Sequence, residues 1–380
     1  MGKLESANAL RFVTWRGCRA RGEDKSVKTL RLSVDPGRLD TAEAKEAIGR
    51  AAEILRSGGL VALPTETVYG LGANALDAAA VGRIFAAKER PSWDPVIVHI
   101  AGPTTANPML EKLVRQVPEA GRRLMAAFWP GPLTLLLPRS SVVPDAVTAG
   151  RPLVGVRMPS HPVAFEVIRL AGVPVAAPSA NKFGRTSPTT AEHVLEDLDG
   201  RIDAIVDAGP TVHGLESTVL DPCQCPMVMY RPGAISAQEI RSVAGAVKAY
   251  RAGAASAAEP REALPSPGVG LRHYAPRARL ILIEGTRADL PERLAQALTQ
   301  QSGERVGIML PAELALDTPR DVAIFPWGRW SVPEEMGRSL YAGLRALDGR
   351  GCTVVLCPVP QGDGISAAIR DRLHKAALGR

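Results

Sequence analysis

Short apolar runs alternate with longer stretches of helical periodicity through the first two thirds of the chain. Between Ala44 and Arg56, for example, apolar residues recur every three or four positions after an Asp40-Thr41 start and before a pair of glycines. This spacing places the apolar side chains on one face of a helix, and the flanking residues are typical start and stop signals. The pattern therefore predicts strands and helices in alternation.

Apolar runs of strand length and amphipathic segments of helix length continue to about residue 248. The expected strands are Thr29–Val34, Leu60–Leu63, Pro95–Ile100, Leu133–Leu137, Val154–Met158, Val173–Ala177, Ala204–Val206, Thr218–Leu220 and Met227–Tyr230. The expected helices include Ala44–Arg56, Ala78–Ala87, Leu110–Phe128 and Val163–Ala171. Residues 28–248 are thus predicted to form one α/β domain built on a large sheet.

A change of composition separates this domain from the rest of the chain. Between Arg251 and Pro276 the sequence is rich in Ala, Gly, Pro and Ser and has no periodicity, which predicts an interdomain linker over residues 249–276. Beyond it we expect strands at Leu280–Ile283, Arg305–Leu310, Val322–Phe325 and Thr353–Cys357, and helices at Leu290–Leu298, Pro333–Leu347 and Ile365–Leu378. Residues 277–380 are predicted to form a smaller, Rossmann-like α/β domain.

Length and charge fit two folded domains with a basic extension. A chain of 380 residues exceeds the size at which one core usually stops growing. The net charge of +7 is concentrated at the start, because residues 1–31 hold eight Lys or Arg against three Asp or Glu. We expect residues 1–27 to be a basic disordered tail. The nearly neutral remainder gives little support to a nucleic-acid-binding surface.

Several classes of function are disfavoured by the sequence. No apolar run approaches the length of a membrane-spanning helix. Five scattered cysteines without a CxxC pair indicate a reducing compartment and provide no evident metal site. No P-loop motif occurs, so a nucleotide would have to be held in another way. The pattern Gly362-x-Gly364-x-x-Ala367 lacks the following strand of a dinucleotide site, which favours a tight turn into the last helix.

Polar clusters follow several of the apolar elements of the first domain. They are Lys88-Glu89-Arg90-Pro91, P-S-A-N-K at residues 178–182, E-S-T-V at residues 216–219, Arg157 and Arg231. Each has an ordinary explanation when taken alone, as a helix end, a turn, a surface charge or a buried ion pair. Because ligands bind beyond strand ends in sheet domains, and Lys, Arg, Ser and Asn suit a polyphosphate, the clusters together predict a nucleotide site.

These clusters occur in the same order in a known family. The motifs are P-T-E-T-V-Y-G-L-G at 64–72, K-x-R-P at 88–91, P-V-I-V-H at 95–99, P-S-A-N at 178–181, E-S-T-V at 216–219, R-P-G at 231–233 and R-H-Y-A-P at 272–276. With them, residues 28–380 resemble the YrdC-like threonylcarbamoyl-AMP synthases, in the two-domain form with an appended Sua-type C-terminal domain. The resemblance implies a twisted open α/β sheet with a concave, positively charged cavity.

The resemblance also implies an activity. It is that of a nucleotidyltransferase, an L-threonylcarbamoyladenylate synthase that converts L-threonine, bicarbonate and ATP into threonylcarbamoyl-AMP and pyrophosphate, with Mg²⁺ accompanying ATP. This is the first step of tRNA N6-threonylcarbamoyladenosine modification in the cytoplasm. A separate transferase complex acts next, so tRNA would meet this protein only indirectly or weakly. No protein ligand is assigned to a metal, and no membrane is involved.

The matched positions give a set of expected site residues. The resemblance implies catalytic roles for Lys88 and Arg90 in stabilising developing negative charge. The expected L-threonine-binding residues are Thr67, Tyr69, His99, Arg157, Ala177 and Ser217. The expected ATP-binding residues are Thr65, Lys88, Arg90, Asp94, Ser179, Asn181, Ser187, Arg231 and Tyr274.

Two positions carry additional expectations. In the resembled family the linker passes over the cavity, so Arg272, His273 and Tyr274 are expected to help close it over ATP and exclude water. Asp94 departs from the family, which usually has Asn before the proline. A carboxylate there would repel phosphate unless it is paired or bound through magnesium.

Two alternative functions share the fold. One is a non-catalytic member that binds double-stranded RNA or tRNA, which the nearly neutral body of the chain disfavours. The other is a carbamoyl-transfer enzyme that uses carbamoyl phosphate, but the acylphosphatase and zinc-finger modules that accompany this fold in such proteins are absent from the sequence.

Overall fold

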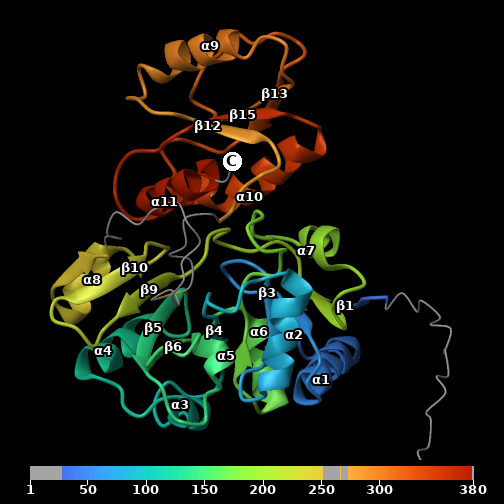
Figure 1. Cartoon of the computed structure of the whole chain (residues 1–380), viewed down its shortest axis with the longest axis vertical. Helices are drawn as coiled ribbons and strands as arrows, with labels where there is room; N and C mark the ends of the chain where they lie inside the picture. The colour runs from blue at the N-terminus through green and yellow to red at the C-terminus, as the bar shows by residue number, and fades with distance from the viewer. Residues whose placement is uncertain (1–27, 251–265, 267–272, 379–380) are drawn as a thin grey trace, which may run out of the picture.

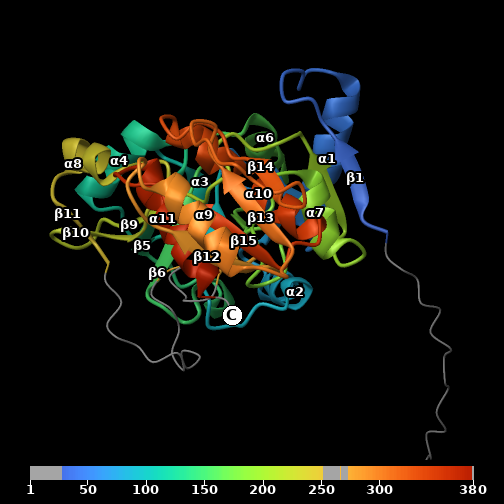
Figure 2. The same ribbon diagram turned by 90° about the horizontal axis from the view of Figure 1, so that it is seen from above.

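The computed structural model describes residues 28–250, 266 and 273–378, and these form two sheets. The larger sheet has eleven strands in the order β1-β8-β2-β3-β7-β4-β6-β5-β9-β10-β11, and it is mixed, with both parallel and antiparallel pairs. The smaller sheet has four strands in the order β12-β15-β13-β14, all parallel. Figure 1 shows the two sheets in separate bodies, one above the other, and Figure 2 shows the smaller body lying over the larger.

The larger body contains most of the elements that the apolar pattern predicts. Its strands are β1 (Leu30–Ser33), β2 (Val61–Leu63), β3 (Gly70–Asn74), β4 (Ile97–His99), β5 (Leu133–Pro138), β6 (Leu153–Arg157), β7 (Val175–Ala176), β8 (Ala204–Asp207), β9 (Thr218–Asp221), β10 (Met227–Arg231) and β11 (Val247–Ala249). Its helices are α1 (Ala42–Arg56), α2 (Ala78–Lys88), α3 (Pro108–Leu113), α4 (Glu119–Phe128), α5 (Asp145–Thr148), α6 (Pro162–Ala171), α7 (Ala191–Leu198) and α8 (Ala237–Ala244).

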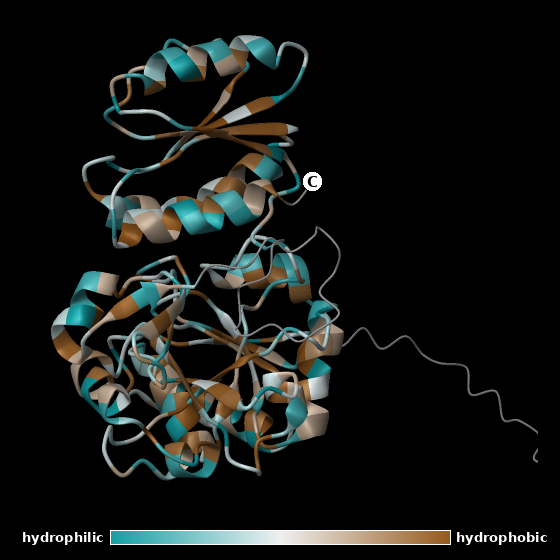
Figure 3. Cartoon of the chain, turned by 60° about the vertical axis from the view of Figure 1, so that its left-hand side comes forward, coloured by the Kyte–Doolittle hydropathy of each residue, from teal (hydrophilic) through white to brown (hydrophobic). Residues whose placement is uncertain are grey.

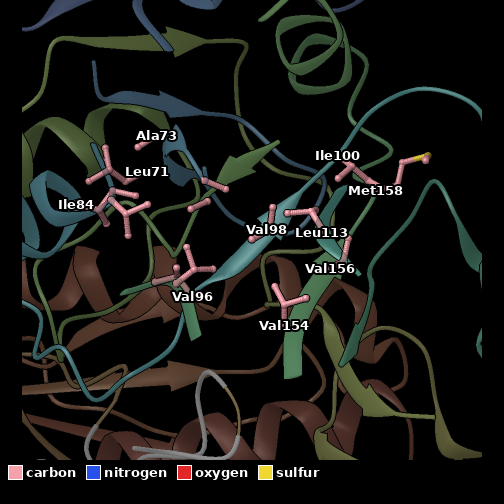
Figure 4. Close-up of a cluster of buried hydrophobic side chains, with 14 of the residues drawn as sticks. Leu71, Ala73, Ile84, Val96, Val98, Ile100, Leu113, Val154, Val156 and Met158 are labelled. Carbon is pink, nitrogen blue, oxygen red and sulfur yellow. The ribbon is translucent and has the colours of Figure 1, made fainter. Parts of the chain in front are cut away.

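Helices cover both faces of the larger sheet. On one face α1 and α6 pack together, and α1 begins at Thr41, whose side chain accepts a hydrogen bond from the Ala44 amide at 3.2 Å. On the other face the core includes Leu71, Ile84 and Val98, which Figure 4 shows beside further aliphatic side chains. Burying apolar side chains on both faces is what holds so wide a sheet in place, at roughly 25 cal/mol per Å² removed from water.

The smaller body is a three-layer sandwich. Its strands are β12 (Arg279–Ile283), β13 (Val306–Leu310), β14 (Ala323–Pro326) and β15 (Val354–Pro358), and its helices are α9 (Leu290–Gln300), α10 (Pro333–Gly349) and α11 (Ile365–Ala377). Helices α10 and α11 lie between this sheet and the larger body, while α9 covers the far face (Figure 1). The strands are largely hydrophobic and the outer side of α9 is hydrophilic (Figure 3).

One expectation about local structure was wrong. The segment Leu110–Phe128 is not one helix, because α3 ends at Leu113, Val114 is extended and pairs with Arg139, and α4 begins only after Pro118. A proline in the interior of a helix removes a backbone hydrogen bond and clashes with the preceding turn, so the periodicity on either side of Pro118 belongs to two helices.

The glycines of the segment 64–72 belong to a strand. Gly70 and Gly72 lie inside β3, where a Cβ atom on Gly72 would come within 2.9 Å of Val175 and 3.1 Å of the Val61 carbonyl oxygen. They allow β3 to approach its neighbouring strands closely. The turn lies before them, in residues 64–69.

The predicted domain limits of 28–248, 249–276 and 277–380 stay predictions. In the structure the last strand of the larger sheet, β11, ends at Ala249, and β12 begins at Arg279. The tail 1–27 lies outside the described residues. None of the helices in the described part of the chain is both long and apolar enough to cross a bilayer.

Candidate active site

A pocket of about 570 Å³, counting the open space at its mouth, lies where several strand ends of the larger sheet meet the linker. Its walls come from the larger body and from the linker residues that precede β12. The lining residues are Thr65, Thr67, Val68, Gly70, Arg90, Pro95, Val96, Ile97, His99, Arg157, Ala177, Pro178, Ser179, Glu216, Ser217, Arg231, His273 and Tyr274.

The turn between β2 and β3 presents hydroxyl groups to the pocket. The Thr65 side chain accepts hydrogen bonds from the amides of Thr67 and Val68 at 3.2 and 3.3 Å and donates to the Val68 carbonyl oxygen at 2.7 Å. Such a hydroxyl turn stops the strand and fixes the backbone locally. The Thr65 and Thr67 hydroxyls lie 2.8 Å apart, so both are held at the pocket wall.

Arg157, at the end of β6, is buried at one end of the pocket and held by three groups. Its guanidinium donates to the Thr67 hydroxyl at 2.8 Å and to the Gly131 carbonyl oxygen at 3.2 Å, and it pairs with the Glu66 carboxylate at 2.6 Å. Burial raises the pKa of Glu66, but the charge and hydrogen bond of Arg157 outweigh it and leave that pKa below its ordinary value. The pair therefore stays ionised.

His99 ends β4 beside Arg157 in the same part of the pocket. Burial, followed by the nearby charge of Arg157, lowers the pKa of His99 to about 3, so the imidazole is neutral at pH 7. Its Nδ1 atom has no hydrogen-bond partner among the described residues. A buried polar atom without a partner is uncommon in a folded protein, which makes His99 a candidate for a role at the site.

Arg90 lies beside the start of β4, whereas Arg157 is paired in the sheet with His99 at the end of that strand, so the two arginines mark opposite ends of the pocket, and Arg90 is paired with Asp94. The two side chains form an ion pair at 2.9 Å, and Arg90 also donates to the carbonyl oxygens of Asp94 and Pro95 at 3.2 and 2.8 Å. Burial raises the pKa of Asp94, but Arg90 and His273 outweigh it and the net shift is downward. Asp94 is thus a paired carboxylate, which answers the concern that it would repel phosphate.

Lys88 lies behind this wall and is almost fully buried, so it is not a solvated helix end. Its Nζ donates to the carbonyl oxygens of Ser179 and Asn181, each at 2.5 Å. Burial and then the charge of Arg90 lower the pKa of Lys88 well below its ordinary value. Lys88 therefore connects the end of α2 to the loop that brings Ser179 to the pocket.

A second pair of residues, Ser217 and Arg231, forms a further wall. Arg231 donates from Nε to the Ser217 carbonyl oxygen at 3.0 Å and from Nη2 to the Ser217 hydroxyl at 3.1 Å. The Ser217 hydroxyl is 2.8 Å from that of Thr134 on β5. Arg231 is buried rather than a surface charge.

The linker reaches the pocket through His273 and Tyr274. His273 lies 3.5 Å from the Asp94 carboxylate, and Tyr274 is buried with its ring 5.7 Å from that of Tyr341 on α10. Tyr274 has a positive φ of 69°, a conformation uncommon for a tyrosine. Arg272 lies outside the described residues.

Most of the residues expected at the site line this one pocket, but five do not. Tyr69 is buried and donates from its hydroxyl to the Gly209 carbonyl oxygen at 2.7 Å. Ser187 donates to Glu216 at 2.5 Å, and Asn181 donates to the carbonyl oxygens of Lys182 and Arg185. With Lys88 and Asp94, these side chains support the wall from behind.

Sequence analysis missed two carboxylates. Glu66 and Glu216 both stand inside motifs that were recognised, and both are buried with an arginine as partner. A buried carboxylate needs such a partner, so a single acidic residue in an otherwise uncharged motif was the available signal. Among the described residues, no three His, Cys, Asp or Glu side chains gather as metal ligands.

Two family models match the chain. The model described as "Telomere recombination" matches residues 53–233, and the model described as "Threonylcarbamoyl-AMP synthase, C-terminal domain" matches residues 235–378. The first covers the body that carries the pocket, and the second covers most of the linker and the smaller body.

Curated proteins of the same length class are similar over most of the chain. A threonylcarbamoyl-AMP synthase of Bacillus subtilis is 43% identical over 93% of this chain and 99% of its own, and one of Pyrococcus abyssi is 42% identical over 86% and 93%. A crystal structure of P. abyssi Sua5 complexed with L-threonine superposes with a TM-score of 0.83, at 40% identity, over 93% of this chain and 98% of that chain.

Proposed function

The chain belongs to the family of threonylcarbamoyl-AMP synthases, and from that premise we propose how its pocket makes threonylcarbamoyl-AMP from L-threonine, bicarbonate and ATP. The observation that carries the proposal is one pocket with buried arginines at both ends, Arg157 at one and Arg90 at the other. An amino acid and a nucleotide both carry anionic groups, so each substrate requires a cationic end.

We assign the Arg157 end to L-threonine. The guanidinium neutralises the substrate carboxylate, while the Glu66 pair and the Thr67 hydroxyl keep it charged and oriented. The free Nδ1 of neutral His99 accepts a hydrogen bond from the substrate amine or hydroxyl. Ser217 and Ala177 complete this part of the wall. The similar P. abyssi Sua5 structure is a complex with L-threonine, which supports an L-threonine site in this family.

We assign the Arg90 end to ATP. Arg90 and Arg231 supply charge to the phosphates, Ser179 and Thr65 supply hydroxyls, and the Tyr274 ring closes the site from the linker. Burying these groups away from water strengthens their interaction with the phosphates.

Four further residues do not line the pocket, but they hold the residues that do. Lys88 and Asn181 hold the loop that carries Ser179, Asp94 holds Arg90, and Ser187 holds Glu216. The negative charge of bound ATP opposes the effect of burial on the Lys88 pKa and so favours the charged ammonium there.

The reaction follows in two steps that need no covalent enzyme intermediate. The threonine amine attacks bicarbonate, and loss of water gives N-carboxy-threonine. A carboxylate oxygen of that carbamate then attacks the α-phosphorus of ATP, forming a new P–O bond while the bond between the α-phosphorus and the bridging oxygen breaks and pyrophosphate leaves. The protein contributes by positioning the reactants and stabilising the charge on the phosphates through Arg90 and Arg231.

Magnesium, tRNA and the cellular compartment also belong to this proposal. Magnesium would accompany ATP as part of that substrate, no side chain of the protein being assigned to hold it, and its charge would offset that of the leaving pyrophosphate. The product passes to a separate tRNA-modifying transferase in the cytoplasm, so tRNA itself binds indirectly or weakly. The thiols in the described part of the chain, Cys223, Cys225, Cys352 and Cys357, are unpaired, consistent with a reducing compartment.

The test is exchange of labelled pyrophosphate into ATP by the full chain. We expect exchange that requires L-threonine, bicarbonate and Mg²⁺ together, because only their combination produces the nucleophile and the reactive adenylate. Exchange that is equal without threonine, or no exchange under any condition, would contradict the proposal. Tight tRNA binding with a steep salt dependence and no exchange would instead support the RNA-binding alternative.

A further inference from the structure

One residue of the smaller body, Arg372 on α11, is completely buried at the boundary with the pocket-bearing body. Its Nε donates to the Glu216 carboxylate at 2.7 Å, and its Nη2 donates to the Pro232 carbonyl oxygen at 3.0 Å. Its guanidinium also lies 5.3 Å from the centre of the Tyr274 ring. Arg372 thus contacts three segments that border the pocket, although it does not line the pocket itself.

Glu216 receives a second donor from the smaller body. The Tyr341 hydroxyl on α10 lies 2.9 and 3.1 Å from the two Glu216 carboxylate oxygens, and Ser187 donates to the same carboxylate at 2.5 Å. Tyr341, like Arg372, is completely buried. The carboxylate is therefore held in one orientation by donors on both sides of the domain boundary, and Glu216 itself lines the pocket.

The residue after Glu216 connects this contact to the proposed substrates. Ser217 accepts two hydrogen bonds from Arg231, one at its carbonyl oxygen and one at its hydroxyl. Arg231 also precedes Pro232, whose carbonyl oxygen Arg372 holds. A shift of the Glu216 backbone would consequently move both Ser217, on the threonine side, and Arg231, on the ATP side.

We propose that Arg372 and Tyr341 are positioning residues of the synthase reaction, through which the smaller body sets the placement of Ser217 and Arg231 for both substrates. The inference rests on the proposed function and deepens it, because it assigns to the C-terminal domain a direct part in substrate binding. Burying a charge at a domain boundary is unfavourable unless the charge is fully paired. Such a contact therefore permits only a narrow range of positions for the groups that it joins.

The boundary offers a matched contact that does not reach the pocket. Arg338 on α10 donates to the Val212 carbonyl oxygen at 2.9 Å, again from the smaller body to the larger. Removing this hydrogen bond reduces docking without touching Glu216. The substitution Arg338→Gln is therefore the control for every variant of the Glu216 contact.

The experiment compares Tyr341→Phe and Arg372→Lys with Arg338→Gln in the full chain. The KM values for L-threonine and ATP are measured by pyrophosphate release, and binding of a non-hydrolysable ATP analogue is measured by calorimetry. Loss of one hydrogen bond to a buried carboxylate predicts about a tenfold rise in both KM values for Tyr341→Phe. We expect a larger rise for Arg372→Lys, which loses the contact with Pro232, and KM values within about twofold of wild type for Arg338→Gln.

The outcomes separate this inference from the proposed function. If Tyr341→Phe is folded and both KM values stay within twofold of wild type, the inference is overturned. It is equally overturned if all three variants lose thermal stability alike without a change in KM or in analogue affinity, since the contact would then serve docking alone. A wild-type chain without threonine-dependent pyrophosphate release refutes the proposed function. In that case the affinities of the variants for the ATP analogue still test whether Arg372 and Tyr341 position the ATP side of the pocket.

Discussion

The two bodies are both α/β layers, yet their buried polar groups serve different ends. In the larger body, buried arginines and carboxylates gather at strand ends around one pocket, and His99 retains a ring nitrogen without a partner among the described residues. In the smaller body, the buried Arg372 donates hydrogen bonds to the Glu216 and Asp371 carboxylates and to the Pro232 carbonyl oxygen. The comparison teaches that the architecture alone does not create a site. The polar groups that it leaves available to a ligand do.

The largest effect, a loss of synthase activity, is expected from removing the positive charge at the nucleotide end of the pocket. The substitution Arg90→Ala should lower kcat/KM by about 10³-fold, because a buried cation aimed at the phosphates is lost and Asp94 is left unpaired. Pyrophosphate release with all substrates measures this. Arg83→Ala, which removes a half-exposed arginine paired with Asp203, is the matched control and should stay within twofold.

A smaller effect is expected at the threonine end when charge is kept but geometry is not. Arg157→Lys retains a cation for Glu66 but loses the planar set of donors that reaches Thr67 and Gly131. We expect the KM for L-threonine to rise by about 30–100-fold while the KM for ATP changes little. An equal rise in both KM values would contradict the division of the pocket into two ends.

The sequence predicted the larger part of this arrangement for a physical reason. Periodicity and turn signals indicate which elements are buried, and polar clusters after apolar runs mark strand ends. They therefore predicted Arg90, Arg157 and Ser217 as site residues, and all three line the pocket. What periodicity does not report is the direction of a side chain after a turn. Tyr69 therefore points to Gly209 instead of the pocket, and Lys88 reaches backbone carbonyls.

Contacts between bodies were out of reach for a different reason. Arg372 and Tyr341 belong to amphipathic helices of ordinary appearance, and which side of such a helix meets another domain depends on how the domains dock. No local pattern pairs them with Glu216, which lies 125 residues or more away in the chain. The break at Pro118 was a local signal, and the helical periodicity on both sides obscured it.

An intermediate effect, on thermal stability, is expected from replacing Glu216 at the boundary between the two bodies, and this effect should depend on pH. Burial raises the pKa of Glu216, but the charges of Arg372 and Arg231 outweigh it and lower the pKa from 4.5 to about 2. A lowered folded-state pKa stabilises the fold above about pH 4.5, and this stabilisation is lost as the pH falls through 2. We expect Glu216→Gln to lower Tm by about 5–10 °C at pH 7, because Arg372 loses its partner.

The difference in Tm between the wild-type protein and Glu216→Gln should be constant from pH 7 to pH 5 and should become smaller below about pH 4.5. Thermal melts between pH 3 and pH 7 measure it, with the exposed Glu46→Gln as control. A difference that widens as the pH falls would mean that Glu216 is not an ionised partner of Arg372.

The smallest effect is expected from the smaller body's surface, where an ion pair looks as well formed as those around the pocket. Arg329 and Glu335 are joined by several hydrogen bonds, yet the Arg329 side chain is 58% exposed. Water and salt screen such a pair, and holding two long side chains in place costs entropy, so Arg329→Gln should shift Tm by less than about 2 °C and leave both KM values unchanged. Melts at low and high salt measure this. The hydrogen-bond geometry is similar in the two ion pairs, so only their exposure to solvent should make their effects differ. A loss of Tm comparable to that of Glu216→Gln would show that exposure does not account for the difference.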